Sequence, residues 1–93
     1  MHDWTLKAIF VDWVSGNVRL DLQSAGGGEV LEAVGLRDLR VPRQFAWGRS
    51  ASVSALVGPN PRPGGLVSVT LEMQSGDEIE VVAESFTLPA ISN

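Results

Sequence analysis

Glycine and proline recur so often along this chain that few runs between them are long enough for a helix. Ten glycines and five prolines divide the 93 residues. No segment of ten or more residues keeps the apolar spacing of a helical stripe. Short β-rich runs separated by turn residues are typical of all-β domains. We therefore predict a small antiparallel β-sandwich or partly open barrel of six to eight short strands, in a single all-β domain covering residues 1–93.

The run IFVDWVSGNVRLDLQ, residues 9–23, predicts a β-hairpin. Gly16 and Asn17 suit a two-residue loop, because such loops favour glycine at their first position. The register that this loop imposes puts five apolar residues on one buried face: Ile9, Val11, Trp13, Leu20 and Leu22. It also sets Asp12 opposite Asp21 on the outer face, where two like charges destabilise a sheet.

The segment after this hairpin predicts a further turn and one or two strands. The AGGG run at 25–28 favours a hairpin connection, because the lysine and the following helix of a phosphate-binding loop are both absent. The run EVLEAVG at 29–35 then predicts a strand. LRDLRVP at 36–42 continues from it and is predicted to form a short fourth strand.

The middle of the chain predicts two loops on either side of a strand. Residues 42–50 show no clear period and carry Phe45 and Trp47, which favours a packed loop. SASVSALVG at 50–58 predicts a strand. The three prolines and two glycines of PNPRPGG, 59–65, predict a mobile surface loop.

The run at 66–88 predicts a final hairpin, and its apolar pattern selects the loop length. A three-residue loop, Ser75–Asp77, gathers the apolar residues on one face, whereas a two-residue loop mixes apolar and charged side chains. The chosen register pairs Met73 with Ile79, Leu71 with Val81, and Val69 with Ala83. It sets Glu72 opposite Glu80 on the outer face.

The composition narrows the possible partners and the location. The net charge of −4 opposes the phosphate backbone, so we expect no nucleic-acid partner. The chain has no cysteine, which excludes disulfides and thiolate metal sites. No apolar run reaches the roughly 20 residues of a membrane span, and the start MHDWTLK lacks the pattern of a signal peptide. We therefore predict a cytoplasmic protein without a membrane partner.

The sequence offers little for catalysis or for metal binding. His2 is the only histidine and stands at the chain terminus, a poor place for a general base. Asp12 and Asp21 could share a divalent cation, but two carboxylates are too few ligands. Opposed carboxylates could also serve a glycosidase, although 93 residues leave little room to enclose a sugar. We predict no enzyme activity and no catalytic, metal-binding or cofactor-binding residue.

Two segments carry opposite charge. Four arginines and Asp38 give residues 37–49 a net charge of +3, whereas residues 72–84 hold five carboxylates and no basic residue. The arginines could bridge the acidic face within one molecule, or one charged surface could remain for a protein partner. For the second case we predict six contact residues: Arg40, Arg43, Trp47, Arg49, Glu72 and Glu80.

Three segments resemble a set of short bacterial proteins without an assigned activity. The likeness lies in MHDWTL at the start, VPRQFAWGRS in the middle and EMQSGDEIEV near the end. Small, acidic, cysteine-free cytoplasmic proteins are also similar in type to immunity proteins that neutralise toxins. The resemblance implies no activity for a named residue.

These observations together favour a non-enzymatic protein-binding domain, with an immunity-type inhibitor of a bacterial toxin as one form of it. The partner is then another protein or a second copy of the chain. The alternative is a small-ligand or carbohydrate-binding β-domain that uses Trp47 and the loop at 59–65.

Overall fold

The computed structural model describes residues 4–43 and 52–89, and six antiparallel strands make up almost all of them. The strands are β1 (Trp4–Asp12), β2 (Asn17–Ser24), β3 (Gly27–Arg40), β4 (Ser52–Arg62), β5 (Leu66–Met73) and β6 (Glu78–Thr87). They lie in the order β1-β2-β3-β6-β5-β4, and a short pairing of β1 with β4 closes the ring. The predicted all-β antiparallel fold is therefore confirmed. No helix of the described residues is long and apolar enough to cross a membrane.

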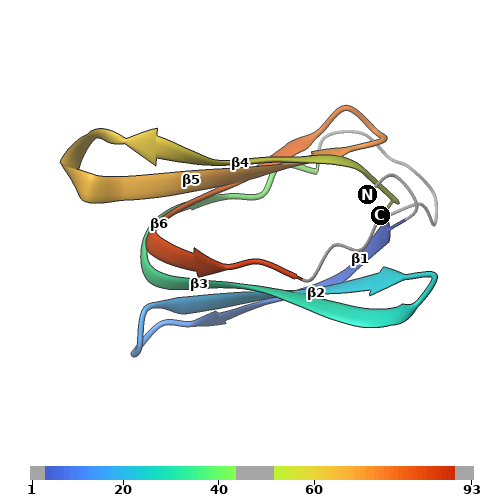
Figure 1. Cartoon of the computed structure of the whole chain (residues 1–93), viewed down its shortest axis with the longest axis horizontal. Helices are drawn as coiled ribbons and strands as arrows, with labels where there is room; N and C mark the ends of the chain where they lie inside the picture. The colour runs from blue at the N-terminus through green and yellow to red at the C-terminus, as the bar shows by residue number, and fades with distance from the viewer. Residues whose placement is uncertain (1–3, 44–51, 90–93) are drawn as a thin grey trace.

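The ring is flattened into two layers, and β3 and β6 bend from one layer into the other (Figure 1). β3 pairs with β2 through its first half and with β6 through its second half. Gly35 lies at the change of partner with a φ of 72°, a left-handed conformation that glycine adopts without a steric penalty. An added Cβ at this position would also lie 2.5 Å from the Glu84 side chain. The predicted strands at 29–35 and 36–42 are therefore one bent strand of 14 residues.

The core lies between the two layers and is built by strands β2 to β6. Its buried residues are Val18, Leu20, Leu22, Leu31, Ala33, Val53, Val69, Leu71, Ile79, Val81 and Ala83. Strand β1 has no fully buried residue, and it adds only the partly buried Trp4, Leu6 and Ile9. β1 is thus the strand that the core covers least.

Strand β4 contradicts the predicted mobile loop at 59–65. Its pairing with β5 continues through Asn60, Pro61 and Arg62, and only Pro63–Gly65 form a turn between the two strands. Prolines cannot donate a ladder hydrogen bond, so they are confined to edge strands and bulges. After Val53, β4 pairs only with β5 among the described residues, and a register shift lies between Val57 and Asn60. The prolines fit because this part of β4 is an edge.

The first hairpin does not have the predicted two-residue loop. Asp12 pairs with Asn17, so the loop has four residues, Trp13–Gly16. Asp12 organises it: its Oδ1 accepts a hydrogen bond from the Ser15 amide at 3.3 Å, and its carbonyl accepts one from the Gly16 amide at 2.9 Å. Gly16 has a φ of 76° and joins the loop to β3, because its carbonyl accepts a hydrogen bond from the Leu36 amide.

The different loop moves the register, and three predictions for this hairpin are wrong. Trp13 lies in the turn rather than in the core, with 85% of its surface exposed. Val11 is also exposed, although Leu20 and Leu22 are buried as predicted. Asp12 and Asp21 are not opposed, since Asp21 faces Ala8.

The last hairpin has a three-residue loop, as predicted, but the loop starts one residue earlier. The Met73 amide donates to the Asp77 carbonyl, which leaves Gln74–Gly76 as the loop. Gly76 has a φ of 100° and so occupies the last loop position, where three-residue hairpins favour glycine. The predicted faces are kept because a shift of the pairing by two residues preserves the alternation. The partners differ: Leu71 faces Ile79, and Glu72 faces Glu78.

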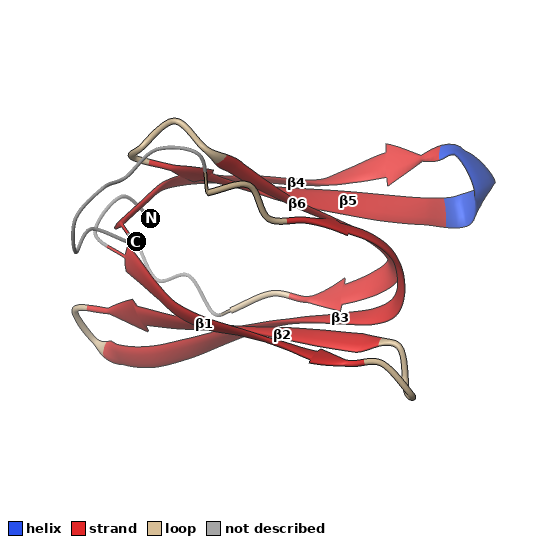
Figure 2. Cartoon of the chain, turned by 180° about the vertical axis from the view of Figure 1, so that it is seen from behind, coloured by secondary structure: helices blue, strands red, loops and turns tan. Residues whose placement is uncertain are grey.

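The predicted connection at 25–28 is confirmed as a hairpin turn. Ser24 pairs with Gly27, and Ala25 and Gly26 form the loop between β2 and β3. The Ser24 hydroxyl accepts a hydrogen bond from the Gly26 amide and donates one to the Gly27 carbonyl. Figure 2 shows this turn and the final hairpin loop at the same end of the ring.

Candidate binding surfaces

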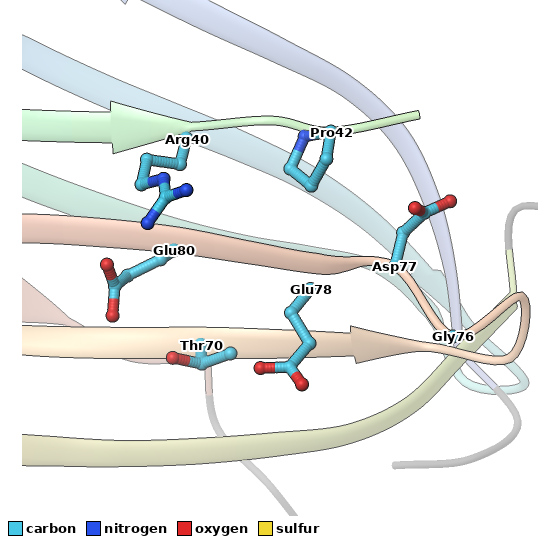
Figure 3. Close-up of a pocket in the computed structure, with 7 residues that line it drawn as sticks. All are labelled: Arg40, Pro42, Thr70, Gly76, Asp77, Glu78 and Glu80. Atoms are coloured by element: carbon cyan, nitrogen blue, oxygen red, sulfur yellow. The ribbon is translucent and has the colours of Figure 1, made fainter. Parts of the chain in front are cut away.

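The first candidate surface is a charged hollow beside the final hairpin loop, with a volume of about 360 Å³ (Figure 3). Its lining comes from β3, β5, β6 and the adjoining loops: Arg40, Pro42, Thr70, Gly76, Asp77, Glu78 and Glu80. Glu80 of β6 faces Arg40 of β3 on one side and Thr70 of β5 on the other. Strand alternation points these three side chains outward, because the neighbouring Ile79 and Val81 point into the core.

Three carboxylate residues and one arginine line the hollow. Figure 3 shows the Arg40 guanidinium extending toward the strand that carries Glu80. Glu80 also lies 3.7 Å from Nη1 of Arg62 on β4. Glu78 faces Glu72 across the β5–β6 pair, and neither carboxylate has a salt bridge within the described residues. Two like charges that face each other in this way destabilise the sheet.

Asp77 belongs to the loop rather than to the binding groups of the hollow. It is buried, with 7% of its surface exposed, and Figure 3 shows its carboxylate directed away from Glu78 and Glu80. Its Oδ2 accepts a hydrogen bond from the Ser75 hydroxyl at 3.0 Å. The same hydroxyl accepts one from the Asp77 amide at 3.2 Å. Asp77 therefore holds the loop conformation beside the hollow.

The structure brings together some of the six predicted contact residues. Arg40 and Glu80 share the hollow, and Glu72 lies beside it, opposite Glu78. Arg43 is exposed beyond the end of β3, with no salt bridge in the described part of the chain. Trp47 and Arg49 lie outside the described residues, as does Phe45 of the predicted packed loop.

The arginines of this segment are not a set of internal clamps within the described residues. Arg37 forms a salt bridge of 3.0 Å with Glu84. Arg40 and Arg43 form none with a described carboxylate. Arg37 is therefore the one described arginine of this segment that bridges a described carboxylate, and Arg49 lies outside the described residues.

The second candidate surface is the end of the first hairpin, where Val11 and Trp13 were predicted to lie in the core. Four apolar residues gather there with large exposed fractions: Phe10 (49%), Val11 (45%), Trp13 (85%) and Val14 (98%). We name these four residues the apolar hairpin end. Asp12 lies four residues before Gly16, and this spacing is a sequence signal for a four-residue loop. It would have predicted that Trp13 and Val14 lie in an exposed turn.

The outer side of this hairpin has a favourable charge arrangement. Arg19 lies opposite Phe10, and its guanidinium carbon is 4.4 Å from the centre of the ring. Its Nε also donates to Oδ1 of Asp21 at 2.9 Å. Such cation–π and ion-pair contacts order both side chains on the sheet surface. One face of the Phe10 ring is thus covered, while about half of the residue stays exposed.

The same hairpin presents an unpaired strand edge. β1 pairs with β4 only at Trp4 and Thr5. From Leu6 to Asp12 it pairs with β2 alone among the described strands. An extended strand edge exposes backbone donors and acceptors that can bind another strand. The bulge between Leu6 and Ala8 disturbs the start of this edge and leaves residues 8–12 regular.

The two carboxylate pairs that the sequence predicted are not formed. Asp12 and Asp21 lie opposite different residues, so the pair proposed for a shared cation is not formed. Glu72 and Glu80 are not opposed either. Within residues 4–43 and 52–89, no group of three or more histidine, cysteine, aspartate or glutamate side chains could hold a metal ion.

No protein family model, curated protein or solved structure matches this chain.

Proposed function

We propose that this chain is a non-enzymatic protein-binding domain and that Trp13 and Val14, at the tip of the apolar hairpin end, are its principal contact residues. The observation that carries the proposal is the exposure of Trp13 and Val14, at 85% and 98%. Exposed apolar clusters on a small protein mark interaction surfaces, and tryptophan is the side chain most enriched at binding hot spots. A side chain so exposed contributes little to the fold, which leaves binding as the reason for its position.

The experiment is affinity capture with the tagged chain and its Trp13→Ala variant. Loss of a hot-spot tryptophan costs about 2 kcal/mol or more, which is roughly a thirtyfold loss of affinity. The variant should keep the unfolding midpoint of the parent, because Trp13 lies outside the core. Val41→Ala is the matched control, since Val41 is another exposed apolar residue but lies after β3.

A parallel pair of variants tests the charged hollow as the contact surface. Arg40→Ala and Glu80→Gln alter the two facing residues of the hollow and leave the hairpin end unchanged. The proposal expects both to retain the captured protein. If these two variants lose the captured protein while Trp13→Ala keeps it, the charged surface predicted from the sequence is the site and the hairpin end is not.

The small-ligand alternative has less support than protein binding. It used Trp47, which lies outside the described residues, and the segment 59–65, most of which is strand. Small-molecule sites are mostly apolar with few polar groups, whereas the hollow is lined mainly by charged and polar side chains. The immunity-type role stays a prediction from the sequence, and the binding proposal does not depend on it.

A further inference from the structure

We infer that two copies of this chain pair along the free edge of β1, in antiparallel orientation, with Phe10 on the twofold axis. The inference goes beyond the proposed function, because it concerns the strand edge and the purified chain alone. Trp13 and Val14, at the tip of the hairpin, remain the contact for another protein. The two proposals can therefore fail separately.

The first support is the incomplete closure of the ring. Only Trp4 and Thr5 of β1 meet β4, so residues 8–12 pair with β2 alone among the described strands. This edge carries apolar side chains that are half exposed, Phe10 on the outer side and Val11 on the inner side. A further strand would complete the ladder and cover both residues.

The second support is the register that a twofold axis allows. Opposed residues of antiparallel strands point to the same side of the sheet, and a twofold perpendicular to the sheet keeps the sides the same. Ile9 and Val11 face the inner side, because their β2 partners Leu20 and Val18 are buried. With Phe10 on the axis, Ile9 of each copy faces Val11 of the other, so every inner residue meets an inner residue.

The third support is charge complementarity at the two ends of this pairing. In the same register Asp12 faces Ala8 of the second copy. Lys7, the extra residue of the bulge beside Ala8, is exposed and has no salt bridge within the described residues. It therefore lies within reach of Asp12 from the other copy. A pairing centred on Val11 would instead set Asp12 opposite Phe10, away from Lys7.

Lysine and a bulge usually protect an edge from unwanted pairing. Here they occupy only the start of the edge, and the carboxylate at the other end of the strand complements the lysine. A partner strand without an acid at that position would leave the Lys7 ammonium uncompensated. The edge thus discriminates against an arbitrary strand and in favour of its own copy.

Sedimentation of the purified chain tests the inference directly. The contact is small, so the monomer should convert to a dimer between about 1 µM and 1 mM. Lys7→Asp or Asp12→Lys alone should raise the dissociation constant about tenfold, because each change opposes two like charges. The double variant should restore the parent value. Asp38→Lys, an exposed acid on β3, makes the same charge change away from the edge and should leave dimerisation unchanged.

Single cysteines test the register, since the chain has no natural cysteine. Opposed residues of antiparallel strands have Cα atoms about 4.5 to 5.5 Å apart, which is within the range of a disulfide. Phe10→Cys should therefore form a covalent dimer on mild oxidation. Gln23→Cys, exposed on β2, is the control and should not. A chain that stays monomeric at about 1 mM, a double variant that does not recover dimerisation, or equal crosslinking of the two cysteines contradicts the inference.

Discussion

The hairpins at the two ends of the chain are both built from alternating apolar and polar residues, yet only one of them is fully used by the core. β5–β6 lies between β4 and β3, and its inner residues Val69, Leu71, Val81 and Ala83 are completely buried. β1–β2 has β3 along one side, and on the other side it pairs with β4 at only two residue pairs. β1 accordingly has no buried residue. An apolar face becomes core only where neighbouring strands cover it.

The largest expected difference between the hairpins is the effect of truncating an apolar side chain. Leu71→Ala should lower the free energy of unfolding by about 2 to 5 kcal/mol, because it removes packed methyl groups and leaves a cavity. Val14→Ala in the first hairpin should change it by less than about 0.5 kcal/mol, since the residue is almost fully exposed. Urea titrations of the two variants measure both values. Equal effects would show that the first hairpin tip is covered in solution.

A smaller effect is expected from the glycine that closes the loop of the first hairpin. Gly16→Ala should cost about 1 to 2 kcal/mol, because its φ of 76° is unfavourable for a residue with a Cβ. Steric contact adds little, as an added Cβ lies 3.9 Å from its nearest neighbour. Gly26→Ala is the control, since that glycine has no positive φ and an added Cβ would make an ordinary contact of 3.8 Å with the Ser24 hydroxyl. A neutral Gly16 variant would mean that the four-residue loop described above is not the one formed.

The outer faces of the β5–β6 and β2–β3 pairs should respond oppositely to the loss of a carboxylate. Glu78→Gln should stabilise the fold by a few tenths to about 1 kcal/mol, because it removes the repulsion from Glu72. Glu32→Gln should be neutral or slightly destabilising, since Glu32 faces Arg19 of β2. Thermal unfolding at low salt measures both shifts. High salt should reduce the contrast, and a contrast that does not depend on salt would exclude charge as its cause.

The smallest expected effect concerns the arginine segment. Arg37→Ala should reduce the free energy of unfolding by no more than about 1 kcal/mol, because exposed ion pairs contribute little. Both Arg37 and Glu84 are more than half exposed in their 3.0 Å salt bridge. Arg43→Ala, without a salt bridge in the described residues, should have no measurable effect on the melting temperature. A large loss for Arg37→Ala would instead show that the bridge holds the bend of β3 together.

The faces of the strands were predicted correctly in the hairpin that the core covers and less well in the hairpin that is more exposed. In the last hairpin the alternation of apolar residues identified the inner face correctly, although Gly76 moved the loop by one residue. In the first hairpin the glycine-asparagine pair suggested a short loop, and the side-chain hydrogen bond of Asp12 favours a longer one. Trp13 was misplaced for this reason. Local turn chemistry decided its position, because none of the described strands lies beside this end of β1 to impose the register.

The candidate surfaces were predictable to different degrees. Arg40 and Glu80 were predicted as contact residues from their charges, but their direct opposition across β3 and β6 depends on a pairing between strands far apart in the sequence. The prolines of β4 suggested a loop. A strand tolerates proline only at a sheet edge or a bulge, and the local sequence does not reveal that this part of β4 is an edge. The edge of β1 that no described strand covers could not be predicted from the sequence either, because it depends on where β4 separates from β1.

The sequence by itself determined the β class, the position of most turns, the inner faces of β2, β5 and β6, and the opposite charges of two segments. These properties depend on residues that are close along the chain, through alternation with a period of two and the conformational preferences of glycine. The tertiary structure alone decided that β3 bends to join β6, that β1 and β4 separate after two residue pairs, and that Phe10 and Val11 remain exposed. The reason is that exposure depends on which distant strand lies alongside, and neither apolarity nor spacing within one segment contains that information.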